Sequence, residues 1–348
     1  MTMTHVNTDG SSGEGDGGAV TLSQHEALSL AVAAVRGVGI DGESAVIIAE
    51  HVLDAELRGH VGLSRIVPLA KQWAAFRGER RNLAVVQESG CSAVVDGGNQ
   101  PGMVVAERAT RICIAKARDA GMAIVAANNH QYSGLLSYYV EKVAREGLVG
   151  LAVATGFPRV APHGGRIAKL GTNPLAFGFP TADGPIVVDL ATSSISGGEL
   201  LRRAAANEPL PSGAALDAAG RPTTNAVEAV GGVLVPWGGH RGSALAIAVQ
   251  LLGVLCGMKP LPAGDDGWAF LMIGLSPVLF GPAGRFEALA AEFAESIRAT
   301  PAAEGHDSVR MPFDRSRAAR AVRRSDGVTL PAATYRQLAE IARGRVDE

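Results

Sequence analysis

The groups that could bind a small ligand are gathered in three turns, two of them glycine-rich. Residues 162–165 read Pro-His-Gly-Gly, residues 189–193 read Asp-Leu-Ala-Thr-Ser after an apolar run, and residues 238–242 read Gly-Gly-His-Arg-Gly before an apolar helix. Glycine lets backbone N–H groups approach a ligand, and a helix start attracts anions, here with Arg241 beside it. Each turn has an ordinary structural explanation as well, so the residues alone leave both interpretations open.

Motifs that would identify a reaction are missing from the sequence. No Gly-x-Gly-x-x-Gly follows a strand-like run and no Gly-x-x-x-x-Gly-Lys-Ser/Thr occurs, so neither an ordinary Rossmann fingerprint nor a P-loop is supported. His51 and His60 stand nine residues apart and no His-Glu-x-x-His occurs, so no metal is expected. The Gly-x-Ser-x-Gly elbow of hydrolases is also missing.

The composition excludes several classes of protein. The 348 residues are 47% hydrophobic with a net charge of −2, which favours an enzyme with a large core over a nucleic-acid binder. Three cysteines without a Cys-x-x-Cys pair fit a reducing compartment, and we expect a cytoplasmic protein. No stretch is apolar enough to span a membrane. The one basic run is expected to be a solvated helix face: Arg315, Arg317, Arg320, Arg323 and Arg324.

The elements that position the turns alternate between helices and strands, which predicts an α/β protein. Helices are predicted near residues 23–35, 42–58, 63–76, 101–120, 135–146, 242–255, 285–298 and 332–343. Strands are predicted near residues 85–86, 93–95, 122–126, 150–154, 174–179, 186–188 and 269–273. Because helices stand at both ends of the chain, we expect the two ends to pack together as one subdomain.

These patterns divide the chain into four parts. Residues 1–20 are rich in Gly, Ser and Asp and predict a disordered tail. Residues 21–82 form the first part of a helical subdomain, and residues 83–283 form the α/β domain. Residues 284–348 are expected to complete the helical subdomain by packing against its first part.

Two stretches closely resemble the type-2 malate/L-lactate dehydrogenase family, which includes ureidoglycolate and sulfolactate dehydrogenases and cyclic-imine reductases. They are VAPHGGRIAKLGTNPLAFGFPTADGPIVVDLATS, from Val160, and ALDAAGRPTTNAVEAVGGVLVPWGGHRG, from Ala215. The resemblance implies a non-Rossmann nicotinamide-binding sheet domain with a helical subdomain formed by both chain ends. It also implies a homodimer with its active site near the subunit interface. Members reduce 2-oxo acids or cyclic imino acids with NADH or NADPH, or run the reverse reaction.

On the cofactor side the resemblance is well preserved. The resemblance implies that the cofactor is NAD or NADP, with NADPH slightly favoured, and that a set of turn residues binds it. Arg241 stands where the family usually has a Lys, so a cation that faces a phosphate is kept. The residues that the resemblance implies for cofactor binding are Thr155, Gly156, Phe157, Pro158, Asn173, Asp189, Leu190, Ala191 and Arg241.

On the substrate side the chain departs from the family. The family's Ser-His-Gly-x-x-Arg signature aligns its last Arg with Arg65, but Val61 stands at the usual His, and His60 could supply an imidazole instead. The second signature, Asn-Ser-x-His-x-Gly, has Tyr132 in the place of its acid/base His. A Lys that is common after the Ala-Thr-Ser segment is replaced by Glu199, which is expected to be a solvated helix-start residue.

These changes predict a particular chemistry. A Tyr with an ordinary pKa of about 10 can donate a proton but is a poor base, so a Tyr132 enzyme should favour reduction over oxidation. Arg65 is expected to hold a substrate carboxylate in its bidentate fork, with a surface salt bridge as the alternative. His130 either contacts the catalytic side chains without touching the substrate, or it is a solvated loop residue. His60 is slightly more readily explained as structural than as catalytic.

Two functions follow. The first is an NAD(P)H-dependent reductase of a 2-oxo acid or a 2-imino acid, in specialised metabolism, with the catalytic set Tyr132, His130, His60 and Arg65. The second is a repurposed member that has lost hydride transfer and performs non-redox chemistry or binding. The loss of His from both signatures supports the second function, and the preserved cofactor turns favour the first. The expected partners are a small-molecule substrate and a second copy of the chain, with neither nucleic acid nor membrane.

Overall fold

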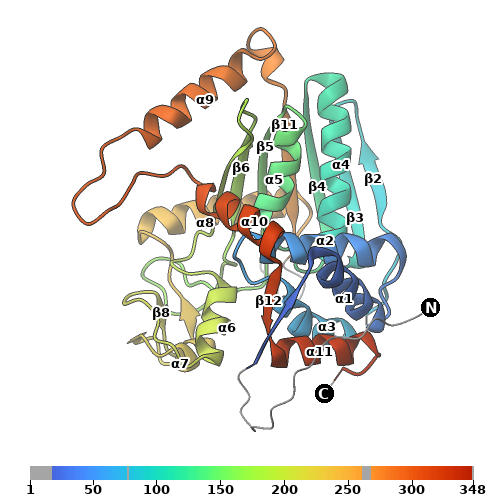
Figure 1. Ribbon diagram of the computed structural model, residues 1–348, viewed down its shortest axis with the longest axis vertical. Coiled ribbons are helices and arrows are strands. Elements are labelled where there is room, and N and C mark those ends of the chain that lie inside the picture. Colours follow the sequence, from blue (N-terminus) through green and yellow to red (C-terminus); the bar gives the residue numbers. More distant parts are fainter. Residues whose placement is uncertain (1–17, 77, 261–267, 347–348) are drawn as a thin grey trace.

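The computed structural model describes residues 18–76, 78–260 and 268–346, and its main element is a seven-stranded mixed sheet (Figure 1). The strand order is β2-β3-β4-β11-β5-β6-β7, in which β3 and β4 pair in parallel and the other neighbours pair antiparallel. The strands are β2 (Ala84–Glu88), β3 (Ser92–Gln100), β4 (Met122–His130), β5 (Val149–Ala154), β6 (Leu175–Phe179), β7 (Ile186–Leu190) and β11 (Phe270–Leu275).

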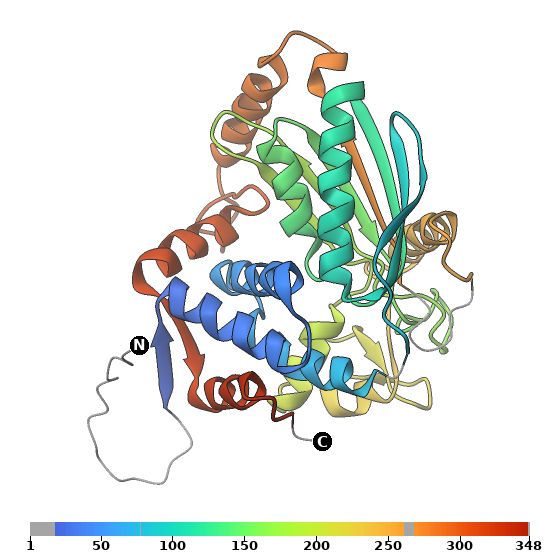
Figure 2. The same ribbon diagram turned by 90° about the vertical axis from the view of Figure 1, so that its right-hand side faces the viewer.

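Alternation of side chains along β4 gives the sheet two buried faces. Ala123, Val125 and Ala127 pack on one face with α4 (Gly102–Ala120) and α5 (Leu136–Arg145). Ile124 and Ala126 point to the other face, where α8 (His240–Leu255) covers the sheet. Figure 2 shows the same three layers from the side. A sheet covered on both faces leaves the strand ends as the places where polar side chains can reach solvent.

The two ends of the chain pack together, as predicted (Figure 2). β1 (Ala19–Leu22) pairs antiparallel with β12 (Val328–Pro331), and α1 (Gln24–Gly37) packs against α11 (Ala332–Ala342). Ser23 and Glu26 form a capping box at the start of α1: the Ser23 side chain accepts from the Glu26 N–H while the Glu26 carboxylate accepts from the Ser23 N–H. The other helices of this part are α2 (Gly42–Leu57), α3 (Ile66–Ala75) and α10 (Asp314–Asp326), with a short 3-10 helix η1 (Leu63–Arg65) before α3.

A smaller unit lies below the main sheet in Figure 1 and contains the second resembling stretch. A three-stranded sheet in the order β10-β8-β9 packs with α6 and α7 around its own apolar cluster. Its elements are β8 (Ala215–Leu216), β9 (Pro222–Thr223), β10 (Val233–Leu234), α6 (Gly197–Ala205) and α7 (Ala226–Val230). The 3-10 helix η3 (Pro277–Leu279) leads to α9 (Arg285–Arg298), which lies apart from α1 and α11 in both views.

Two sequence-based expectations need correction. The tail was expected to reach residue 20, but Ala19 and Val20 belong to β1; residues 1–17 lie outside the described residues. The basic run was expected to be solvated throughout, but Arg320 on α10 is buried. Its burial is explained by its pairing with Glu141, a carboxylate 179 residues earlier in the chain. Among the described helices, none is long and apolar enough to cross a bilayer.

Candidate active site

Three aromatic side chains meet where strands of the main sheet end. Tyr132 follows β4, Phe157 follows β5, and Trp268 precedes β11, which lies between β4 and β5. The Trp268 ring stands edge-on to the Tyr132 ring at a centroid distance of 6.0 Å and to the Phe157 ring at 5.8 Å. All three side chains are half-buried. The sheet order therefore places the sequence-predicted Tyr132 and Phe157 on either side of a Trp.

Two guanidinium groups complete this arrangement. Arg65 from η1 lies over the Tyr132 ring at 5.7 Å, and Arg159 lies over the Phe157 ring at 4.9 Å. We call Arg65, Tyr132, Trp268, Phe157 and Arg159 the arginine–aromatic cluster. Neither arginine forms an ion pair with a described carboxylate, and Arg65 Nε and Trp268 Nε1 are buried without a hydrogen-bond partner among the described residues. Buried donors without partners are costly in a folded protein, which is typical of a binding site.

The surroundings of Tyr132 keep its hydroxyl protonated. Burial raises the pKa of Tyr132, and the charge of Asp189 raises it further, while Arg65 lowers it in part. The net direction is upward from an ordinary value of about 10, so Tyr132 carries its proton at neutral pH. The hydroxyl bonds to no other described residue. Tyr132 can therefore donate a proton to a ligand, whereas it is poorly suited to act as a base.

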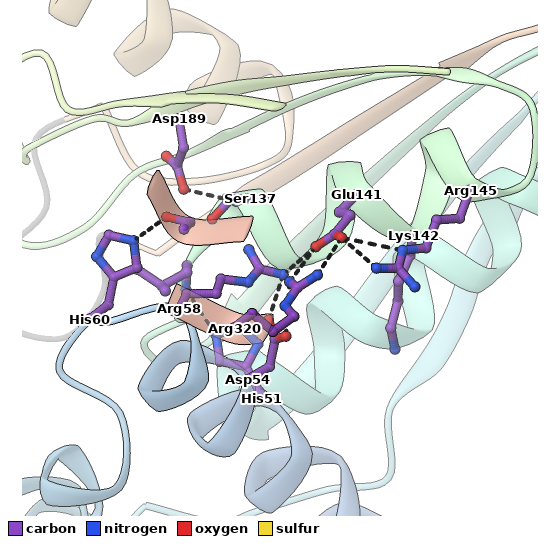
Figure 3. Close-up of polar contacts among 12 residues, drawn as sticks. His51, Asp54, Arg58, His60, Ser137, Glu141, Lys142, Arg145, Asp189 and Arg320 are labelled. Atoms are coloured by element: carbon purple, nitrogen blue, oxygen red, sulfur yellow. Dashed lines mark hydrogen bonds and ion pairs between the residues drawn. The ribbon is translucent and has the colours of Figure 1, made fainter. Parts of the chain in front are cut away.

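The Asp189 carboxylate acts electrostatically on both Tyr132 and His60. Figure 3 shows Asp189 and His60 with their polar contacts. Asp189 Oδ2 accepts from the backbone N–H of Ser137 at 2.8 Å, in the first turn of α5, which has no side-chain cap of its own. His60 Nε2 is 3.4 Å from Ser316 Oγ on α10. Burial and the Arg58 charge lower the pKa of His60, and Asp189 raises it in part. Asp189 thus anchors a helix start, while its neighbour His60 is mainly neutral.

His130, at the end of β4, is buried, so the expected alternative of a solvated loop residue is wrong. Its Nδ1 donates to the Gln131 carbonyl oxygen at 2.6 Å, and its Nε2 has no described partner. A second imidazole, His51 of α2, is also buried, and its Nε2 accepts from the Leu135 N–H at 2.9 Å. The residue before Leu135 must be glycine, because a Cβ on Gly134, at φ 80°, would lie 2.1 Å from that nitrogen.

These two imidazoles predict a loss of stability in mild acid. Burial lowers the pKa of His51 to about 3, helped by the charges of Arg58 and Lys142, and burial lowers that of His130 to about 4. On acidification the unfolded chain, with an ordinary pKa of about 6.5, therefore takes up protons first. We expect the free energy of unfolding, measured with urea, to fall from about pH 6.5 downward. His130→Asn should reduce that slope, and a flat wild-type profile down to about pH 4.5 would contradict the prediction.

The loop after β5 joins the cluster to the rest of the sheet. Thr155 is buried, and its Oγ1 accepts from the Ala269 N–H at 3.0 Å, which fixes the end of β5 to the start of β11. A Cβ on Gly156 would lie 3.0 Å from the Trp268 ring, so glycine lets the indole rest on the backbone. Pro158, between Phe157 and Arg159, is half-buried. The loop assigned to the cofactor thus also positions the aromatic side chains.

The Asn173 side-chain nitrogen makes hydrogen bonds that hold the structure together. The residue is fully buried at φ 37°, and its Nδ2 donates to the Ala246 carbonyl and to Gln250 Oε1, both at 2.8 Å. These bonds fix the Gly-Thr-Asn-Pro turn to α8. Its Oδ1 is buried without a described partner. After Asp189 on β7, Leu190 is half exposed and Ala191 is partly buried.

The two glycine-rich turns, residues 162–165 and 238–242, meet in one pocket of about 260 Å³ at the start of α8. The lining comes from both turns and from the strand ends between them: Ala161, Pro162, His163, Gly164, Gly165, Ser194, Gly213, Val235, Pro236, Gly238 and Gly239. Arg241 is exposed in the first turn of α8, where a cation is unfavourable next to the helix dipole unless an anion accompanies it. The segment from Arg159 to His163 connects this pocket to the arginine–aromatic cluster.

Behind the site, a buried charge cluster ties three parts of the chain together (Figure 3). Glu141 of α5 accepts two hydrogen bonds from Arg320 of α10, both at 2.7 Å, and one from Arg58 at the end of α2, at 2.6 Å. Asp54 pairs with both arginines, and Arg145 binds Glu141 from the solvent side. Burial alone would raise the pKa of Glu141, but Arg320 and Arg58 hold it at about 2.

Comparison with known proteins identifies the fold. The sequence profile described as Malate/L-lactate dehydrogenase matches residues 22–339, nearly the whole described chain. The chain belongs to the malate/L-lactate dehydrogenase family. It is 32% identical over 340 residues to "(2R)-3-sulfolactate dehydrogenase (NADP(+))" of Chromohalobacter salexigens, covering 93% of this chain and 99% of that protein. It is 31% identical over 334 residues to "Delta(1)-pyrroline-2-carboxylate reductase" of Ancylobacter novellus, covering 92% and 96%.

A solved structure supports the same assignment. A dehydrogenase from Sinorhizobium meliloti superimposes with a TM-score of 0.85 at 30% sequence identity, covering 94% of this chain and 99% of that one. Membership of the malate/L-lactate dehydrogenase family makes the protein an NAD(P)-dependent oxidoreductase. No group of three or more His, Cys, Asp or Glu among the described residues could hold a metal ion. Sequence reasoning missed Trp268 and Arg159, although Arg159 adjoins the loop that the resemblance assigned to the cofactor.

Proposed function

We propose that this member of the malate/L-lactate dehydrogenase family is an NAD(P)H-dependent reductase of a 2-oxo acid or a 2-imino (cyclic imine) acid. The observation that carries the proposal is the pairing of Arg65 with Tyr132. A guanidinium with no ion-pair partner among the described residues lies over a phenol that keeps its proton at neutral pH. An acid with a reducible C=O or C=N beside its carboxylate fits these two groups.

In the proposed reaction, a hydride adds to the substrate carbon and a proton adds to its oxygen or nitrogen. The reduced nicotinamide, when bound, supplies the hydride. Arg65 holds the carboxylate with its bidentate fork and orients the C=O or C=N bond. Tyr132 donates its phenolic proton to the heteroatom and regains one from water. His130 and His60 stay neutral near neutral pH. We propose that they support Arg65 and Tyr132 without contacting the substrate.

The residues present fit a dinucleotide. The pocket at the start of α8 offers backbone groups of Gly164, Gly165 and Gly239, with the Arg241 cation nearby, and this chemistry suits a pyrophosphate. We assign Thr155, Gly156, Phe157 and Pro158 to the nicotinamide half, Asp189, Leu190 and Ala191 to the cradle beside it, and Asn173 to holding the turn against α8. NADPH is slightly favoured over NADH, and one relative is named for NADP(+).

Nucleotide binding tests the proposal directly. Titration of the purified protein with NADPH or NADH should quench Trp fluorescence with micromolar affinity, because Trp268 lies beside the nicotinamide loop. Arg241→Ala should weaken binding of both nucleotides without unfolding the exposed helix start. Failure of both nucleotides to bind would favour the second function, a repurposed, non-redox protein; the exposed Val61 at the usual His position supports that alternative.

The direction of catalysis is a separate prediction. Because Tyr132 has a raised pKa, we expect reduction of the oxo or imino acid to be much faster than oxidation of the product near neutral pH. Rates in both directions over a range of pH would test this. The oxidation rate should rise toward high pH as the phenol ionises. An oxidation rate that rivals reduction at neutral pH would show that another group acts as the base.

We also propose that the protein is a homodimer in a reducing, cytoplasmic compartment. α8 exposes Ile247, Leu251 and Leu255, four residues apart along one stripe, which suits contact with a second copy. The three cysteines, Cys91, Cys113 and Cys256, are free thiols. Sedimentation equilibrium should give twice the mass of one chain, and Leu251→Glu should shift it toward the monomer.

A further inference from the structure

The arginine–aromatic cluster contains one more cation than the proposed reaction uses. Arg65 suffices for the carboxylate beside the reacting carbon, yet Arg159 stands at the other end of the same row of rings. The contacts run without interruption from Arg65 through Tyr132, Trp268 and Phe157 to Arg159. No described Asp or Glu neutralises either guanidinium.

The start of α6 lies against both arginines of this row. A Cβ added to Gly198 would lie 2.2 Å from Arg65 Nη2, and one added to Gly197 would lie 3.5 Å from Arg159 Cδ. Two adjacent residues of α6 therefore lie next to the two arginine side chains, which places both side chains at the start of the same helix. Both arginines are half-buried, and burial lowers the pKa of Arg159, as expected for a guanidinium that lacks a counter-charge.

We propose that Arg159 binds a second acidic group of the substrate, so that the enzyme selects 2-oxo or 2-imino acids with two negative charges over those with one. The proposal rests on the proposed reductase function. Arg65 holds the carboxylate next to the reacting carbon, and Arg159 holds the far carboxylate or sulfonate in its fork. A singly charged acid would leave the Arg159 cation half-buried and unpaired, which disfavours its binding.

A matched pair of substrates tests this selection. Oxaloacetate and 2-oxobutanoate have the same chain length and differ by the terminal carboxylate. Arg159→Met keeps an apolar stem against Phe157 and removes the charge. We expect this variant to lower kcat/KM for oxaloacetate about 10- to 100-fold. The value for 2-oxobutanoate should stay the same or rise, because the unpaired charge that disfavours this acid is removed. Arg159→Lys should restore part of the loss, because it keeps the charge without the fork.

Two further variants separate the roles of the arginines. Gly198→Ala would push the flexible end of Arg65 aside, and we expect kcat/KM to fall for both acids by similar factors. Arg166→Met removes an exposed cation a short way along the chain from Arg159 and should change neither value. Equal losses for both acids in Arg159→Met would overturn the proposal. So would weaker NADPH binding in that variant, since Arg159 would then serve the cofactor.

Failure of the proposed function is distinguishable from failure of this inference. Calorimetric titration of the NADPH-loaded protein with malate and with 2-hydroxybutanoate measures acid binding without turnover. If neither oxo acid is reduced but malate binds more tightly than 2-hydroxybutanoate, and does so through Arg159, the second anion site stands while hydride transfer is lost. If oxaloacetate and 2-oxobutanoate are reduced equally well, the reductase stands and the selection by Arg159 is wrong.

Discussion

Replacing Tyr132 with Phe should lower kcat for reduction by roughly 10²- to 10⁴-fold, which is the usual contribution of a positioned acid. Phe keeps the ring that packs on Trp268 and under the Arg65 guanidinium, so folding and NADPH binding should be unchanged. The loss should fall on kcat rather than on KM, because the proton moves in the transition state. Stopped-flow measurement of NADPH oxidation under single-turnover conditions isolates this step from product release.

Tyr138→Phe provides the matched control. Tyr138 is another buried tyrosine of the same region, but its ring packs on His51 and Lys142, away from the arginine–aromatic cluster. Removing the Tyr138 hydroxyl should leave kcat within about threefold of the wild-type value, because the change lies away from the reacting groups. If Tyr132→Phe keeps a third or more of the wild-type kcat, the proton donor is another group. His130→Asn and His60→Asn would then decide between the two nearby imidazoles.

Most helices and strands could be predicted because local periodicity encodes them. The capping box at Ser23, the regular apolar spacing of α4 and the continuous apolar run of α8 act over a few residues, and all three helices form. The direction in which the strands pair, by contrast, could not be predicted from local periodicity. The predominantly antiparallel sheet depends on β11 inserting between β4 and β5, over a sequence separation that no local pattern records. The burial of Arg320 likewise depends on Glu141, on a helix far away in the chain.

The candidate site also combines residues that the sequence could predict with residues that it could not. Tyr132 and Arg65 stand in stretches whose spacing resembles a family signature, so each could be proposed from the sequence. Trp268 could not, because its importance arises from two ring contacts made across neighbouring strand ends. Arg159 was hidden for a similar reason: a single arginine after a proline is ordinary until the fold places it opposite Arg65. Residues that act as a set across the sheet need the topology before they can be recognised.

Replacing Glu141 with Gln should destabilise the protein by about 3–5 kcal/mol, the usual effect of removing one partner from a buried charge cluster. Gln has nearly the same shape, so the cost comes from the charge. Arg320 and Arg58 would keep their buried positive charges and share the Asp54 carboxylate alone. Because these arginines come from α10 and α2 while Glu141 is on α5, the loss should loosen the contact between the helical chain ends and the sheet. Urea denaturation measures the change.

The matched control is Glu43→Gln, which breaks the exposed pair with Arg111 and should cost less than about 1 kcal/mol. Similar losses in the two variants would contradict the importance assigned to the buried cluster. The pH dependence provides a second check. The pKa of Glu141 is held at about 2 in the folded protein, below its ordinary value, so its contribution is complete above about pH 4.5 and is lost as the pH falls toward 2. Glu141→Gln should therefore flatten the stability profile in that range, while the histidine-dependent fall at higher pH should persist, since His51 and His130 remain buried.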